Sequence, residues 1–196
     1  ELYNSFGVKR FVRHKWYLLW LVLFAFYSCE EESTEPKDSG EITLSSRILG
    51  TQIYYVNGFS FERDEMIPTT GSNGYMPDIV AENIEIRDPF TGELGIALVL
   101  RSATTNPNGF VLNRKFQDLD EAQQWFDNYA EVEFDNPFWR TDTLTSDPVY
   151  PIYTYRTTAD NYVKMLIKDV NIIGSDYGEV VLEYRIQRDG STTFTD

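Results

Sequence analysis

Two methionines in a turn-rich segment are the residues whose type and spacing suggest chemistry. Met66 and Met76 lie ten residues apart between residues 63 and 78, where two prolines and two glycines favour a loop or a long hairpin. A thioether sulfur is a soft ligand that can hold haem iron from an axial position. Two such side chains over an aromatic pocket would clamp haem without histidine. The alternative is that each methionine covers local apolar surface.

The first 28 residues differ in composition from the rest of the chain. Four basic residues precede a run of twelve uncharged and mostly apolar residues, Trp16 to Tyr27. This run has the length of a signal-peptide core, whereas a membrane-spanning helix needs about 20 apolar residues. A small residue, Ser28, precedes the only cysteine, Cys29, and this ending resembles the lipobox of bacterial lipoproteins. We therefore expect residues 1–28 to be a lipoprotein signal peptide and Cys29 to be lipidated; the alternative is a buried core helix ending in an inert cysteine.

Acidic residues dominate the segment after the cysteine, and residues 29–41 predict a flexible polar tether ahead of one β-rich domain at 42–196. The formal net charge is −14; without the leader's four basic residues and one acid, 13 basic and 30 acidic residues remain, which gives −17. Such a charge argues against a nucleic-acid partner. An acidic run after a lipidated cysteine resembles the signal that sends some Gram-negative lipoproteins to the cell surface. We expect an outer-membrane, surface-displayed protein, although any solvated tether can be acidic.

Most catalytic and metal-binding constellations are missing from the sequence. The only histidine, His14, leaves with the predicted leader, so Ser-His-Asp and Cys-His systems and His-rich metal sites are excluded. Phosphate-binding glycine motifs and HExxH are absent. The acidic segments at 118–121 and 135–136 do not match an EF-hand loop. We therefore expect no metal ion and no enzymatic activity, while the 31 acidic residues leave a paired-carboxylate hydrolase as a weaker alternative.

From residue 42 onward, segments rich in β-branched and aromatic residues alternate with turn residues and predict about eight strands. These segments are 42–49, 53–61, 79–86, 95–101, 110–116, 149–156, 162–170 and 180–188. Asp118 or Asp120 can cap one short helix, whose apolar residues recur at three- and four-residue spacing: Leu119, Ala122, Trp125, Phe126 and Tyr129. We expect a mainly-β fold, an antiparallel β-sandwich or open barrel with this helix packed on it.

Three aromatic residues surround the Asn-Pro turn at 136–137: Phe134, Phe138 and Trp139. Such a cluster can line a ligand pocket or form an exposed patch. More often it closes one end of a sandwich core. The third methionine after the leader, Met165, alternates with Val163 and Ile167 and is expected in the core.

The C-terminal region resembles that of the HmuY-like lipoproteins. The resemblance rests on Tyr162-Val163-Lys164-Met165-Leu166-Ile167, on the strand 178–184, and on Gln187-Arg188-Asp189-Gly190-Ser191-Thr192-Thr193-Phe194. These stretches are similar to the family's YxKhxhxD strand followed by an hxhxYxhQxDGSxxF strand, where h is hydrophobic. Residues 58–61 and 77–79 resemble the family's upstream strand pair. The resemblance implies an all-β, haem-capturing surface lipoprotein whose axial ligands, His or Met, come from paired loops. The motif does not extend to the ligands, so the candidates are the loop residues Met66 and Met76, with Tyr75 as a third.

Three hypotheses follow for the function. The first is a lipid-anchored, non-catalytic module that captures haem through methionine or tyrosine ligands. The second is an adhesion or assembly module without a small-molecule ligand, which predicts an exposed aromatic patch at Phe138 and Trp139 and no enclosed pocket. The third is a small hydrolase, which requires two acids facing one cleft.

Overall fold

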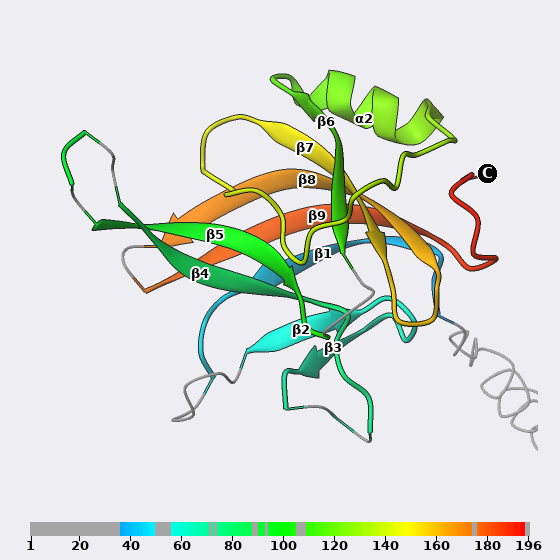
Figure 1. The fold of residues 1–196 in the computed structure, drawn as a ribbon, viewed down its shortest axis with the longest axis horizontal. Coiled ribbons are helices and arrows are strands. Elements are labelled where there is room, and N and C mark those ends of the chain that lie inside the picture. Colours follow the sequence, from blue (N-terminus) through cyan, green and yellow to red (C-terminus); the bar gives the residue numbers. More distant parts are fainter. Residues whose placement is uncertain are drawn as a thin grey trace, which may run out of the picture. The chain divides into compact units, whose positions relative to one another are not determined.

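Two antiparallel β-sheets pack face to face in the part of the chain that the structure describes (Figure 1). This computed structural model describes residues 36–49, 56–70, 72, 74–87, 90–92, 94–104, 109–173 and 176–194. The five-stranded sheet has the order β1 (Ser39–Ser45), β9 (Tyr177–Gln187), β8 (Tyr162–Ile173), β7 (Tyr150–Arg156), β6 (Phe110–Phe116). The four-stranded sheet has the order β3 (Glu65–Pro68), β2 (Asn57–Ser60), β4 (Ile79–Arg87), β5 (Leu94–Ser102). With one short helix, these strands confirm the predicted fold class.

Alternating side chains place one face of each sheet in a shared core. In β9, Val180, Leu182 and Tyr184 are buried while their neighbours are partly exposed, as expected for a strand with one face on the core. Residues of β2, β4 and β5 meet them from the other sheet. The buried Met165 belongs to the same cluster, as predicted.

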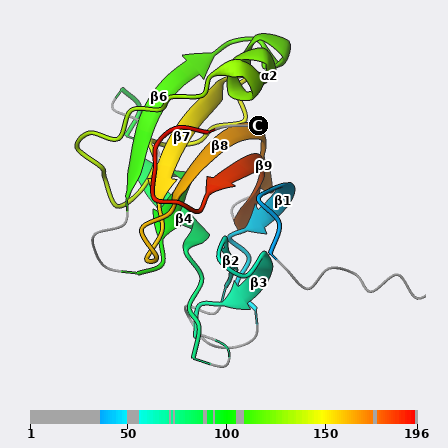
Figure 2. The same ribbon diagram turned by 90° about the vertical axis from the view of Figure 1, so that its right-hand side faces the viewer.

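Helix α2 (Leu119–Asn128) covers the outer face of the five-stranded sheet, at the opposite end of the molecule from β2 and β3 (Figure 2). It begins where the sequence predicts, because the Asp118 side chain accepts a hydrogen bond from the N–H of Glu121 at 3.0 Å. Its buried residues Ala122 and Phe126 pack against Ile152 of β7 and Leu166 of β8. Strands β7 and β8 are therefore covered on both faces.

A buried lysine holds the C-terminal segment against this helix. The ammonium group of Lys164 on β8 donates to the Tyr129 carbonyl at 2.8 Å and lies 5.0 and 5.2 Å from the ring centres of Phe126 and Phe194. Phe194 also donates its N–H to the Ala130 carbonyl. The lysine and the final phenylalanine of the sequence motif thus have a packing role, because a buried ammonium group needs such partners.

Two segment boundaries differ from the sequence-based expectation. Ser39–Glu41, expected at the end of the flexible tether, form the first residues of β1 and pair with residues 183–185 of β9. Their backbone groups form hydrogen bonds with β9, and polar side chains do not prevent this pairing at the edge of a sheet. The strand expected at 53–61 begins at Asn57 in the described residues, while positions 50–55 lie outside them, as do the predicted leader, Cys29 and residues 30–35. No helix within the described ranges combines the length and hydropathy needed to cross a bilayer.

Candidate functional site

The three candidate haem ligands lie on one feature, the β2–β4 connection, defined here as residues 61–78 and including β3. Met66 lies in β3, and Tyr75 and Met76 lie between β3 and β4. Their exposed fractions are 43 %, 50 % and 45 %. Half-exposed large apolar side chains gathered in one short segment are a feature of interaction sites. The structure therefore brings the three residues onto one connection and leaves all three accessible.

Met66 and Pro77, the residue that follows Met76, lie on opposite faces of the β2–β3 hairpin. Met66 pairs with Phe59 across the hairpin and so shares its face, which is the core side of the sheet. Pro77 packs on the other face, over Gly58, where a Cβ would lie 2.6 Å from the Pro77 Cβ.

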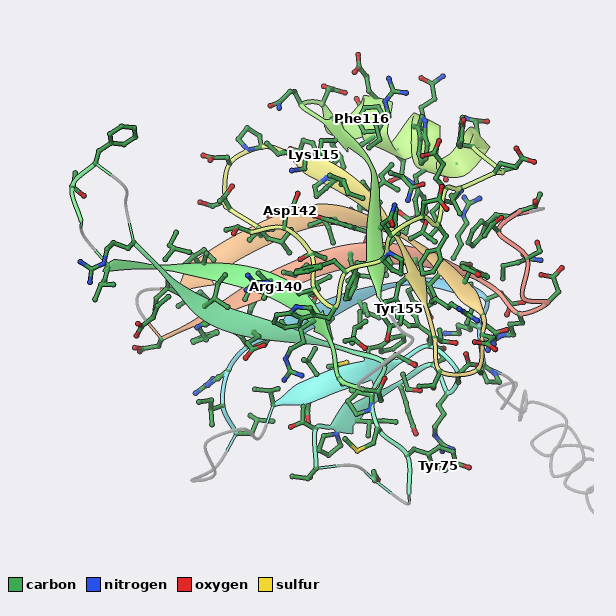
Figure 3. All side chains as sticks on the ribbon, viewed as in Figure 1. Tyr75, Lys115, Phe116, Arg140, Asp142 and Tyr155 are labelled. Carbon is green, nitrogen blue, oxygen red and sulfur yellow. The ribbon has the colours of Figure 1, made fainter. Side chains whose placement is uncertain are left out.

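Tyr75 is held at the tip of the connection, at the periphery of the molecule (Figure 3). Its backbone forms two hydrogen bonds with Ser72, at 2.8 and 2.9 Å, which close a tight turn. The Arg63 guanidinium lies 4.2 Å from the centre of its ring and also forms an ion pair with Glu65. One face of the Tyr75 ring is thus occupied by a cation.

The connection is anchored to the core by Asp78. One carboxylate oxygen accepts from the N–H of Phe61 at 2.8 Å, and the Asp78 carbonyl accepts from the Tyr155 hydroxyl at 2.8 Å. Burial raises the pKa of the Asp78 carboxyl to about 6; the Phe61 N–H opposes this shift, and the charge of Glu62 adds to it. Both ends of the connection are therefore fixed, and its stability depends on a buried acid.

A second polar network ties the start of the connection to the five-stranded sheet. Glu62 accepts hydrogen bonds from Thr157 at 2.7 Å and Asn161 at 2.9 Å, and it forms an ion pair with Arg188 at 3.2 Å. Arg188 also bonds Asp38 at 2.7 Å. These acids serve as hydrogen-bond acceptors in a structural network. None of the described residues forms a group of three or more His, Cys, Asp or Glu that would hold a metal ion.

The aromatic segment is part of a strap, residues 137–144, that joins the edges of the two sheets. Phe138 exchanges two backbone hydrogen bonds, of 2.8 and 2.9 Å, with Phe110 of β6. On the other side, the Trp139 carbonyl accepts from the Ser102 N–H, and the Thr141 and Leu144 N–H groups donate to carbonyls of β5. The backbone therefore closes this side of the sandwich.

The side chains of the three aromatic residues do not form one cluster. Phe138 and Trp139 are 56 % and 49 % exposed and lie 5.9 Å apart between ring centres. The Arg140 guanidinium lies 5.0 Å from the Trp139 ring. Phe134 instead packs edge-on against Tyr162, at 5.0 Å. The strap thus presents a patch of two exposed rings, and Phe134 belongs to the packing of β8.

Sequence reasoning missed a cavity of about 260 Å³ between the strap, the segment that follows it, and strands β6 to β8. Its lining consists of Lys115, Gln117, Thr143, Leu144, Thr145, Val149, Pro151, Tyr153, Ile167 and Val170. One signal was present in the sequence, because a proline inside a predicted strand indicates an interrupted ladder. Pro151 lies in β7 at this position. Neither methionine of the β2–β4 connection lines this cavity.

Comparison with known proteins adds no family to this geometry. The chain matches no protein-family model, and no curated protein matches it.

Proposed function

We propose that the chain is a lipid-anchored, non-catalytic binding module displayed at the outer surface of the cell. The basic and apolar leader, Cys29 and the acidic residues after it support the anchor and the location. The observation that carries the binding role is the accessibility of Met66, Tyr75 and Met76 on one firmly anchored connection. Exposed apolar side chains on a fixed loop can contact a ligand without the entropy cost of ordering the loop.

Haem is the ligand that these side chains fit best. Its porphyrin is flat and apolar, and its iron accepts thioether and phenolate ligands. The HmuY-like resemblance of the C-terminal strands supports the same choice. We expect haem to bind at the β2–β4 connection, where the three side chains are exposed.

Titration of the purified chain with haemin tests the proposal. Met66→Leu and Met76→Leu nearly conserve volume and remove only the sulfur. We expect the wild type to shift the Soret band, and each variant to weaken binding or alter the band. Met165→Leu is the matched control, because this sulfur is buried in the core. A free-haemin spectrum with the wild type, or equal effects of all three substitutions, would contradict the proposal.

A second candidate function is adhesion or assembly without a small-molecule ligand. The exposed rings of Phe138 and Trp139 on the strap favour it, because aromatic side chains beside an arginine are typical of protein interfaces. The same titration separates the two candidates. An unchanged haemin spectrum would leave the strap as the better-supported binding surface.

A further inference from the structure

The edge strands of the two sheets differ in how far they are covered. The strap forms backbone hydrogen bonds with the edges of β6 and β5. The edge strand β3 has four residues and ends at Pro68, which has no N–H to donate. Strand β1 has seven residues and no proline, and among the described strands it pairs with β9 alone, without a register shift (Figure 2). It is therefore the long open edge of the described part of the sandwich.

Half of the backbone groups of β1 point away from β9. At the two ends of the strand, the Asp38 carbonyl accepts from the Ile186 N–H at 2.7 Å, and the Ser46 N–H donates to a β9 carbonyl at 2.9 Å. In an antiparallel pair, residues that bond the neighbouring strand alternate with residues that face away from it. Glu41 and Thr43 therefore direct their N–H and C=O groups outward. Neither residue forms a backbone hydrogen bond with any other described segment, so an added strand can use these groups.

The side chains of β1 give its two faces different chemistry. Ile42 and Leu44 point to the core, whereas Glu41 and Thr43 lie on the outer face and are exposed. Leu44 is fully buried, but Ile42 packs on the same core and remains partly exposed. The core is thus incompletely covered at the edge of the sheet. An apolar side chain on a neighbouring strand would complete the cover of Ile42.

The outer face beside this edge carries an excess of carboxylates. A depression of about 550 Å³ lies over β1 and β9, and its lining contains three acids and one basic residue: Asp38, Glu41, Glu183 and Arg185. Arg185 is paired with a carboxylate of α2 at 2.5 Å. Lys168 lies 2.7 Å from Glu41 and 3.4 Å from Glu183, so one cation serves two acids. Arg188 is shared in the same way between Asp38 at 2.7 Å and Glu62 at 3.2 Å. A side chain placed beside Glu41 therefore meets a negative surface.

We propose that the free edge of β1 binds an extended segment of another protein as an additional antiparallel strand, and that this segment alternates basic and apolar residues. Its basic side chains lie on the outer face beside Glu41, and its apolar side chains lie on the core face beside Ile42. A second copy of the chain is a poor occupant, because each copy carries a formal charge of −14 and would bring another Glu41 to the same surface. The proposal does not depend on haem binding at the β2–β4 connection.

A dye-labelled peptide of alternating lysine and valine, seven residues long like β1, tests the site by fluorescence anisotropy with the whole chain. We expect saturable binding that weakens as salt is added, and no binding when glutamate replaces lysine. Methylation of the lysine amide nitrogens should weaken binding at least about tenfold, because in an antiparallel pair these N–H groups donate to β1. Methylation of the valine amide nitrogens should have a smaller effect, because these N–H groups point away from β1.

Variants of the chain locate the binding. Thr43→Pro removes an outward N–H and places a ring at the edge without removing a bond to β9, so it should abolish binding. Thr43→Ala keeps the N–H and should bind as the wild type does. Glu41→Gln should weaken binding about threefold, the size expected of an exposed ion pair. Glu133→Gln is the matched control and should leave binding unchanged, because this exposed acid lies beside Asn113 of β6, at the opposite edge of the sheet.

Absence of peptide binding, binding that survives Thr43→Pro, or methylated peptides with equal or reversed effects would overturn the proposal. A concentration-dependent dimer of the whole chain that Thr43→Pro prevents would identify a second copy as the occupant and would overturn it as well. The unfolding temperature of each variant shows whether it is folded. If Thr43→Pro destabilises the chain, the methylated peptides and the comparison of Glu41→Gln with Glu133→Gln decide the question.

Discussion

Replacing Asp78 by asparagine should change how the stability of the chain depends on pH. The carboxylate is buried at the end of the β2–β4 connection and accepts a hydrogen bond from the Phe61 N–H. Asparagine keeps the size and an acceptor oxygen but cannot ionise. The substitution therefore isolates the free-energy cost of a buried negative charge.

The magnitude follows from the shift of the Asp78 pKa. The rise from 3.8 to about 6 corresponds to about 3 kcal/mol at ~1.4 kcal/mol per pKa unit. Between these two pH values the folded state binds more protons than the unfolded state, so this group lowers stability as the pH rises. From the two pKa values, about 1.4 kcal/mol of this loss of folding stability falls between pH 5 and pH 7.5, and almost none falls at higher pH.

Urea unfolding at several pH values from 5 to 7.5 measures this effect. The free energy of unfolding of Asp78→Asn minus that of the wild type should rise by about 1.4 kcal/mol across the interval. The same change at Asp135 is the control, because it removes a carboxylate from an exposed position. If the difference in unfolding free energy between Asp78→Asn and the wild type varies by less than about 0.5 kcal/mol across this pH range, ionisation of the buried Asp78 does not destabilise the folded chain, and the reasoning is refuted.

Two further predictions concern packing. Gly58→Ala should lower the free energy of unfolding by more than about 2 kcal/mol, measured with urea, because the new Cβ would lie 2.4 Å from a β4 carbonyl oxygen. Gly95→Ala is the control and should change it by less than ~1 kcal/mol, because the nearest neighbour of its Cβ would lie 3.6 Å away. Similar costs for both variants would contradict the close approach of β2 to β4 at Gly58. Phe194→Ala should lower the free energy of unfolding by about 3 kcal/mol, because it removes a buried ring that packs on the Lys164 ammonium group. Phe90→Ala is the control and should have little effect, because that ring is almost fully exposed. A Phe194→Ala variant as stable as the wild type would show that the C-terminal segment does not pack against the sheet.

Local patterns in the sequence were sufficient to predict the fold class and the helix. Asp118 followed by apolar residues at three- and four-residue spacing predicts α2, and the structure confirms both the cap and the buried residues Ala122 and Phe126. The alternation in β9 likewise identifies its core face. These features depend on near neighbours in sequence, which the chain displays directly.

The site features depend on contacts between distant segments. The strap is formed by backbone pairing of Phe138 and Trp139 with β6 and β5, and backbone pairing leaves no residue-type signature. The face of Met66 is set by the hairpin register, and Pro77, packed over Gly58, fixes the segment that follows Met76. Spacing along the chain therefore identified candidate ligands but not their relative orientation.

Hydrogen–deuterium exchange of the intact chain, with and without haemin, tests most directly whether the β2–β4 connection is the binding surface. We predict that haemin slows exchange in residues 57–79 and leaves the strap, residues 137–144, unchanged. Unchanged exchange throughout the chain, or slowing confined to the strap, would contradict the account.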